Sequence, residues 1–129
     1  MPRNTRLKVN LKRAYEAPSR SDGQRILVDR VWPRGVRKAD LELTEWLRDV
    51  APSKELRQWF DHDPARWVEF RRRYFAELDA RPDAWWGLLD AARRGEVTLL
   101  FAARDLDHNN AVALKEYLEG KLHQEAKSS

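Results

Sequence analysis

One stretch of the chain joins an apolar run to a polar, aromatic and rigid one: Arg25-Ile26-Leu27-Val28-Asp29-Arg30-Val31-Trp32-Pro33-Arg34-Gly35. The consecutive apolar residues 26 to 28 predict a strand that is covered on both faces, as strands of a parallel sheet are. Asp29 and Arg30 then fall at the carboxyl end of this strand, and Pro33 and Gly35 stop it. Because ligands of open α/β sheets bind outside the carboxyl ends of the strands, the stretch predicts the floor and wall of a binding site.

A second apolar run lies near the other end of the chain, Val97-Thr98-Leu99-Leu100-Phe101-Ala102-Ala103. It also predicts a buried strand, and residues 104 to 110 form its polar exit. The long segment between the two runs has helical periodicity. Such a crossover is right-handed and joins parallel strands. We therefore expect both runs to be interior parallel strands whose carboxyl ends lie at one edge of the sheet.

The rest of the pattern completes a small α/β fold. Leu7, Val9 and Leu11 alternate with polar residues, which predicts a further strand with one buried face and one basic, wet face. Apolar spacing, helix stops and caps predict helices at about 43–50, 53–60, 64–78, 82–94 and 110–122, with Ser53 as the cap of the second and Asp63, before Pro64, as the cap of the third. We expect one α/β domain over residues 1–129 with a mostly parallel sheet of about three strands flanked by helices. Its ordered core would span about 7–122, with a flexible tail at 123–129.

Composition limits the classes of function. The chain has 129 residues, 36% of them charged, and a net charge of +4. This charge permits contact with phosphates but does not require it. Cysteine is absent, which excludes disulfides, thiolate nucleophiles and cysteine-bound metals. No apolar run approaches membrane length, so we expect a cytoplasmic protein without a membrane partner.

The two polar strand exits supply the candidate site residues. Parallel strands would bring together residues that are far apart in the sequence, beside the start of the last helix, whose free N–H groups favour an anion. The candidates for catalysis are His108, as proton donor or acceptor, and Asp29, which could orient an arginine. The candidates for ligand binding are Arg30, Trp32, Arg34, Arg104, Asn109 and Asn110.

Each candidate also has a purely structural interpretation. Asp29 and Arg30 could form salt bridges with neighbouring loops, and residues 108–110 could be only a helix entry with Asn109 as its cap. Most tryptophans fall on helical core faces, but Trp32 does not, so it is the tryptophan expected to cover a ligand. His62 between two aspartates suggests a metal ligand, yet no metal motif accompanies it. We therefore predict neither a metal nor another cofactor.

Three functions stay open on the residues alone. The first is an enzyme or sensor for a small phosphorylated, nucleotide-like or carboxylate ligand held by the arginines. The second is a nucleic-acid-binding module in which Trp32 stacks on bases and basic residues contact phosphates, namely Lys8, Lys12, Arg34, Arg37 and Lys38. The third is an interaction domain without chemistry. The oligomeric state is not predicted.

Several segments resemble the YeaO-like bacterial proteins of a wider family of unknown function, numbered 488. The resemblance covers about residues 7 to 120 and rests on Val28 to Gly35, Trp46, 51–53, 56–60, 62–64, 70–78, 98–105 and 108–111. It implies a small cytoplasmic α/β domain and brings no established reaction. Wider relatives keep Asp-x-Arg after the first buried strand and Cys-His-Arg near the last. This chain has Asp29-Arg30 without the spacer, and His108 without the Cys or Arg, so thiol chemistry is not carried over. A transcriptional-regulator role finds no helix-turn-helix pattern to support it.

Overall fold

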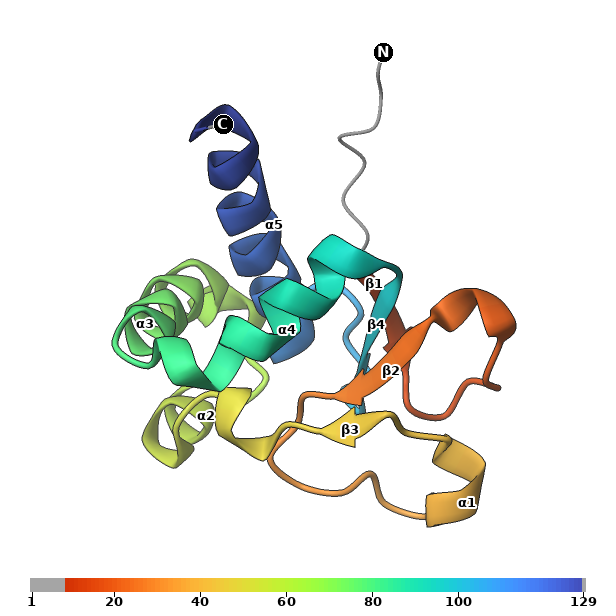
Figure 1. Cartoon of the computed structure of the whole chain (residues 1–129). Coiled ribbons are helices and arrows are strands. Elements are labelled where there is room, and N and C mark those ends of the chain that lie inside the picture. Colours follow the sequence, from red (N-terminus) through yellow and green to blue (C-terminus); the bar gives the residue numbers. More distant parts are fainter. Residues whose placement is uncertain (1–8, 129) are drawn as a thin grey trace.

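The computed structural model describes residues 9–128 and shows one α/β domain built on a four-stranded parallel sheet (Figure 1). The strands are β1 (Val9–Arg13), β2 (Gln24–Leu27), β3 (Glu45–Trp46) and β4 (Val97–Phe101), in the spatial order β1-β4-β2-β3. β4 pairs in parallel with both β1 and β2, and β2 pairs in parallel with β3. The prediction that the two apolar runs form interior parallel strands is confirmed.

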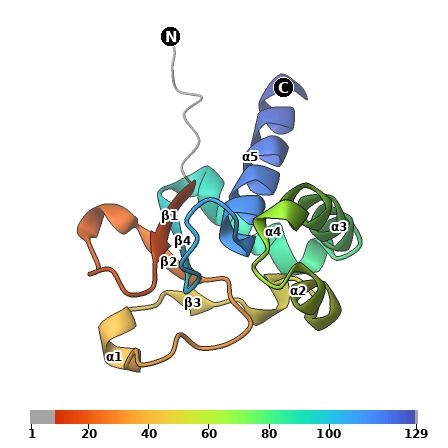
Figure 2. The same cartoon turned by 180° about the vertical axis from the view of Figure 1, so that it is seen from behind.

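Helices connect the strands and cover the sheet unequally. Within residues 9–128 the α-helices are α1 (Lys38–Leu41), α2 (Lys54–Phe60), α3 (Trp67–Asp79), α4 (Pro82–Arg94) and α5 (Asn110–Ser128). Short 3-10 turns occur at η1 (Arg20–Asp22), η2 (Arg48–Val50) and η3 (Pro64–Arg66). Helices α2 to α5 gather on one side of the strands, whereas α1 and two long loops lie on the other (Figures 1 and 2).

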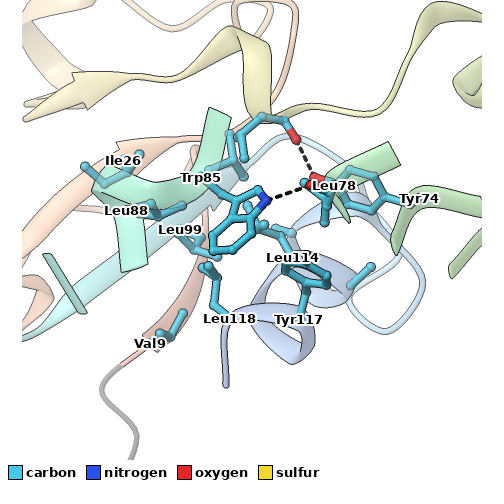
Figure 3. Close-up of a cluster of buried hydrophobic side chains, with 14 of the residues drawn as sticks. Val9, Ile26, Tyr74, Leu78, Trp85, Leu88, Leu99, Leu114, Tyr117 and Leu118 are labelled. Atoms are coloured by element: carbon cyan, nitrogen blue, oxygen red, sulfur yellow. Dashed lines mark hydrogen bonds between the residues drawn. The ribbon is translucent and has the colours of Figure 1, made fainter. Parts of the chain in front are cut away.

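The larger hydrophobic core lies between the sheet and the long helices. It combines apolar side chains of β1, β2 and β4 with those of α2 to α5 (Figure 3). The polar atoms of its aromatic residues have partners, as buried polar groups require. Trp85 Nε1–H donates to the Leu78 carbonyl at 2.8 Å, and the Tyr74 hydroxyl donates to the Val50 carbonyl at 2.5 Å. The predicted inward faces of α3, α4 and α5 are confirmed.

A smaller core covers the opposite face of the sheet. Leu27 of β2 and Leu100 of β4 are fully buried there, under Leu41 of α1. Trp32 and Trp46 pack against this cluster with their rings edge to face, 5.4 Å apart between centroids. β2 is therefore buried on both faces, as its unbroken apolar run predicts, although the second face has no long helix over it.

The helix predicted over residues 43–50 is wrong, and β3 and η2 occupy this segment. The reason is pairing with the edge of the sheet. Thr44 N–H donates to the Arg25 carbonyl at 2.8 Å, and Leu47 N–H donates to the Leu27 carbonyl at 2.9 Å. The apolar side chains of the segment divide between the two cores instead of sharing one helical face. The sheet thus has four strands where about three were expected.

Local start signals of helices were predicted correctly. Ser53 caps α2, because its hydroxyl accepts a hydrogen bond from Leu56 N–H at 3.1 Å. Asp63 caps the turn that leads into α3, and Pro64 occupies the first position after it. At that position the missing N–H of proline costs no hydrogen bond. These caps depend on residues close in sequence, which is why sequence patterns identify them.

The last helix ends later in the structure than the sequence predicted. Leu7 and Lys8, assigned to the first strand, lie outside the described residues. α5 continues past the predicted end at Leu122 to residue 128, and an ion pair between Arg93 of α4 and Glu125 joins its last turns to the domain. None of the helices in the described part of the chain is long and apolar enough to span a bilayer.

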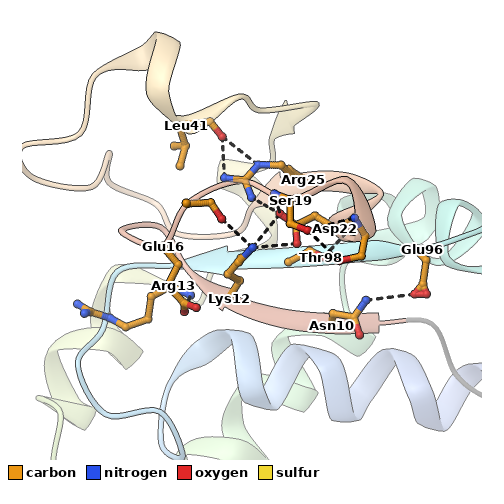
Figure 4. A network of polar contacts seen from close by, with 12 residues as sticks. Asn10, Lys12, Arg13, Glu16, Ser19, Asp22, Arg25, Leu41, Glu96 and Thr98 are labelled. Atoms are coloured by element: carbon orange, nitrogen blue, oxygen red, sulfur yellow. Dashed lines mark hydrogen bonds and ion pairs between the residues drawn. The ribbon is translucent and has the colours of Figure 1, made fainter.

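A buried ionic cluster ties β1, η1 and β2 together on the sheet face opposite the long helices (Figure 4). Asp22 accepts hydrogen bonds from Lys12 Nζ at 3.0 Å and from a guanidinium nitrogen of Arg25 at 2.6 Å. Arg25 also donates twice to the Leu41 carbonyl, at 2.8 and 3.0 Å. The Thr98 hydroxyl of β4 donates to the Asp22 carbonyl. The prediction of a wet basic face on the first strand is therefore wrong for Lys12.

Candidate functional site

A cleft of about 820 Å³ opens at the carboxyl ends of β2 and β4. Its walls come from residues 29–34 after β2, from residues 102–105 after β4, from the start of α5 and from both ends of α2. Tyr15, in the loop after β1, completes the rim. This volume lies within the range typical of small-molecule sites. The cleft forms where the sheet topology predicts a ligand site.

Asp29 lies in the cleft two residues after β2 and is held in place by the backbone that follows β4 and by α5. Its Oδ2 accepts from Ala102 N–H at 2.9 Å, and its Oδ1 accepts from Asn110 Nδ2 at 3.1 Å. Burial raises the pKa of Asp29 above its ordinary value, although these hydrogen bonds and the nearby Arg57 and His62 act in the opposite direction. The carboxyl group is thus fixed, partly desolvated and still turned to the cleft.

Four arginines line the cleft, and they are not equally engaged. Arg57 Nε donates to the Pro52 carbonyl at 3.3 Å, and Arg30 forms only a long ion pair of 3.9 Å with an exposed aspartate. Arg34 and Arg104 are exposed, and their guanidinium groups have neither a hydrogen bond nor an ion pair to any residue in 9–128. Two positive side chains at the rim are therefore available to an anion from solution.

Trp32 lines the cleft but is also part of the smaller core. Its Nε1–H donates to the Val36 carbonyl at 2.7 Å, and its ring packs on Trp46. The prediction that Trp32 lies outside the core is therefore wrong, because its ring packs against the smaller core. The core it joins is built by loop residues, which helical periodicity does not reveal. One face of a ligand could still rest on its exposed part.

His108 does not line the cleft. Its Nδ1 is 2.9 Å from Asp105 Oδ2, and its ring meets the ring of Trp67 edge-on at 5.4 Å between centroids. Asp105 also accepts from Asp107 N–H and from the backbone N–H of His108. These bonds, that from Asp107 foremost, lower the pKa of Asp105. The structure therefore brings Arg30 and Arg34 into one cleft but leaves His108 outside its lining.

Asn109 and Asn110 line the cleft with amides that the fold already uses. Asn109 Oδ1 accepts from Val112 N–H at 3.0 Å, and its Nδ2 donates to the Asp105 carbonyl at 2.8 Å. Asn109 is thus the cap of α5, the structural alternative noted for it. Asn110 Nδ2 donates to Asp29 and to the Val28 carbonyl. The first turn of α5 therefore offers fewer free groups to an anion than the sequence suggested.

Sequence reasoning missed several residues of the cleft, among them Tyr15, Arg57 and His62. His62 had been considered only as a metal ligand. It follows Asp61, and both residues have positive φ angles, 49° and 53°, which end α2 and turn the chain towards the cleft. The His-Asp-Pro helix stop was a visible signal for this turn, but not for its distance from Asp29. Within residues 9–128, no cluster of three or more His, Asp or Glu side chains could hold a metal ion.

The basic residues of the nucleic-acid hypothesis do not form one surface of free charges. Lys12 is half-buried and paired with Asp22, and Arg37 pairs with Asp40 at 3.0 Å. Lys8 lies outside the described residues, whereas Arg34 belongs to the cleft. The arginine run 71–73 on α3 is also paired, with Glu69 and Glu116.

Comparison with known proteins gives a consistent set of relatives. The family model described as "Inactive DUF488-N3 subclade" matches residues 8–129. "Uncharacterized protein YeaO" of Escherichia coli (strain K12) is 40% identical over 112 residues, which cover 87% of this chain and 97% of that protein. "Uncharacterized protein Rv3073c" of Mycobacterium tuberculosis (strain ATCC 25618 / H37Rv) is 44% identical over 121 residues, 94% of this chain and 100% of that protein. No solved structure matches.

Proposed function

The chain belongs to the DUF488 family, in its DUF488-N3i subclade, and we propose that it binds a small anionic ligand in the cleft without transforming it. The ligand would be phosphorylated, nucleotide-like or a carboxylate. One observation carries the proposal: the cleft gathers four arginines, and the guanidinium groups of the two at its rim, Arg34 and Arg104, have no hydrogen-bond or ion-pair partner within residues 9–128. Guanidinium groups bind phosphates and carboxylates through paired, charge-assisted hydrogen bonds.

The contrast with other arginines supports this role for the rim. On the helices, Arg71, Arg72, Arg73 and Arg93 all have acidic partners within hydrogen-bonding distance. These pairs neutralise the charge that the composition suggested could bind phosphate. At the cleft, the only ion pair to a lining arginine is the long one of Arg30, among the described residues. An anion in the cleft would therefore meet positive charge that the protein does not already compensate.

The groups that surround the cleft support binding rather than catalysis. The chain has no cysteine, and His108, the expected proton carrier, is bonded to Asp105 and lies outside the lining. The amides of Asn109 and Asn110 hold α5 and Asp29 in place. The family description, which calls the subclade inactive, agrees with this proposal.

Isothermal titration calorimetry with inorganic phosphate at low salt tests the proposal. The Arg34→Ala/Arg104→Ala double variant should weaken binding at least about tenfold, because each lost charge-assisted bond is worth more than a neutral one. Arg81→Ala is the matched control, since Arg81 is exposed, lies outside the cleft and has no side-chain partner in residues 9–128. It should change the affinity less than about twofold. Equal losses in both variants, or no binding of phosphate by the wild type, would overturn the proposal.

Salt dependence separates the cleft from a nucleic-acid surface. A protein that neutralises several phosphates of duplex DNA loses affinity with a log–log slope of about −0.9 per contact. A cleft that holds one small anion should show a slope near that of one contact. A slope equivalent to several contacts, with binding that survives the double substitution, would favour the nucleic-acid module instead.

A further inference from the structure

Asp29 poses a problem for any anion that enters the cleft. The same cleft that presents Arg34 and Arg104 at its rim holds this carboxyl group after β2. A phosphate placed beside a carboxylate is repelled, and the repulsion is larger in a partly desolvated site. The anionic part of a ligand must therefore stay with the rim arginines, and a different chemical group must face Asp29.

Asp29 cannot easily turn away to avoid the ligand. Its two oxygens accept hydrogen bonds from Ala102 N–H of the chain after β4 and from Asn110 of α5. These bonds fix the carboxyl group between two elements of the fold. A carboxylate offers about four acceptor positions, so the two bonds leave capacity for further donors. The side that faces the cleft thus presents a fixed acceptor.

The side chains near Asp29 determine which donor groups fit best beside it. Arg57 and His62 line the cleft and lie close enough to favour the charged form of Asp29. An ammonium group brought to the carboxylate would also meet the positive charge of the Arg57 guanidinium. Neutral hydroxyl groups donate to a carboxylate without that repulsion. Adjacent hydroxyls of a sugar supply two such donors at once.

Part of the cleft lining is apolar. Phe60 and Phe70 both line the cleft, and their rings are stacked with centroids 4.3 Å apart. Pro33 and Pro52 add further apolar surface. A sugar presents C–H groups on its faces and hydroxyls at its edge, which suits a site with an apolar wall and one fixed acceptor.

We propose that the cleft binds a phosphorylated sugar, with the phosphate on Arg34 and Arg104 and adjacent hydroxyls donating to Asp29. This inference rests on the proposed function and narrows its ligand class. The shared chemistry, a phosphate joined to a ribose-like ring, occurs both in free sugar phosphates and in ribonucleoside phosphates. Tyr15, which is 47% exposed at the rim, is the side chain on which a base could stack.

The first test compares ligands on the wild-type protein by calorimetry. Ribose 5-phosphate should bind at least about tenfold more tightly than inorganic phosphate, and 2-deoxyribose 5-phosphate should lose a large part of that gain. Adenosine 5′-monophosphate separates the two sources. A further gain over ribose 5-phosphate would identify a ribonucleoside phosphate, and equal or weaker binding a sugar phosphate.

The second test changes Asp29 itself. Asp29→Asn keeps an oxygen for Ala102 N–H but removes the charge, so the preference for ribose 5-phosphate over inorganic phosphate should fall to within about twofold. Inorganic phosphate should bind at least as well as to the wild type, because a repulsive charge is gone. The matched control is Asp61→Asn, which removes an exposed aspartate of the same cleft and should keep the preference.

The outcomes separate this inference from the function on which it rests. Phosphate binding with no preference for ribose 5-phosphate would overturn the sugar inference and leave the anion site standing. An Asp29→Asn variant that keeps the full preference would overturn the sugar inference in the same way. Failure of the wild type to bind phosphate, ribose 5-phosphate or adenosine 5′-monophosphate would overturn both proposals. The ligand comparison needs no substitution, so it decides the matter even if Asp29→Asn does not fold.

Discussion

Two aspartates flank strand β2, Asp22 before it and Asp29 after it, and their surroundings differ. Asp22 is 7% exposed and receives two cationic side chains, Lys12 and Arg25, on its carboxylate. Asp29 faces a cleft and is bonded only to neutral groups, a backbone N–H and the amide of Asn110. In the first region the protein compensates its own charges. In the second, the guanidinium groups of Arg34 and Arg104 at the rim have no partner within residues 9–128, as the proposed anion site requires.

The pKa values of the two carboxyl groups move in opposite directions. Burial alone would raise the pKa of Asp22, but hydrogen bonds from Ser19 N–H, Lys12 and Arg25 outweigh burial, and the pKa is lowered. At Asp29 burial outweighs the bonds, and the pKa is raised. The comparison teaches that a buried acid stabilises the fold where cationic side chains bind it directly. Where they do not, the acid can still accept hydrogen bonds from a ligand.

The largest effect should come from breaking the charge cluster. Asp22→Ala leaves the buried Arg25 and the half-buried Lys12 without an acid, so the free energy of unfolding should fall by about 3–5 kcal/mol. Urea denaturation measures the loss. Asp40→Ala, which removes an exposed ion pair with Arg37, is the control and should cost less than about 1 kcal/mol. Similar losses in both variants would show that the buried cluster contributes no more than a surface pair.

A smaller effect on stability is expected for Trp32, which both packs in the smaller core and lines the cleft. Trp32→Ala should cost about 2 kcal/mol, less than a fully buried tryptophan, because the ring is only partly buried against Trp46. It should also weaken phosphate binding in the cleft. Trp86→Ala, at an exposed position of α4, should change stability by no more than about 0.5 kcal/mol. Thermal melts and calorimetry on both variants check this, and equal melting temperatures would assign Trp32 to the ligand alone.

The smallest effect on stability concerns Asp29, for which the structure predicts the direction of the change with pH. A raised pKa in the folded state means that Asp29 favours folding below its ordinary value of 3.8, and that this contribution is lost as pH rises through the folded value. Asp29→Asn should remove this downward trend and change stability at neutral pH by about 1 kcal/mol or less.

Asp22→Asn should reveal the opposite trend. The contribution of Asp22 is present above 3.8 and is lost as pH falls through its lowered folded value, so the gap between wild type and variant should close in acid. Urea denaturation of wild type and both variants between about pH 2.5 and 7 checks the two signs. Trends of the same sign would contradict the contrast between the two aspartates.

Local sequence patterns predicted much of this structure. The unbroken apolar runs predicted β2 and β4, the Ser53 and Asp63 caps predicted helix starts, and the resemblance to YeaO-like proteins predicted the family, all confirmed. Because parallel strands end at the same edge, the sequence also predicted which two segments meet at the cleft. These inferences depend on neighbours in the chain or on a general rule of topology.

Tertiary structure alone decided which strand segments and side chains become hydrogen-bond or ion-pair partners. β3 exists because two backbone hydrogen bonds to β2 hold residues 44 and 47, and helical spacing of its side chains gave no sign of that. His108 bonds to Asp105, whereas His62 reaches the cleft through the turn that ends α2. Lys12 finds Asp22 across the loop between β1 and β2. A side chain's partner depends on distances that only the packed chain sets, so residue type and spacing alone do not identify it.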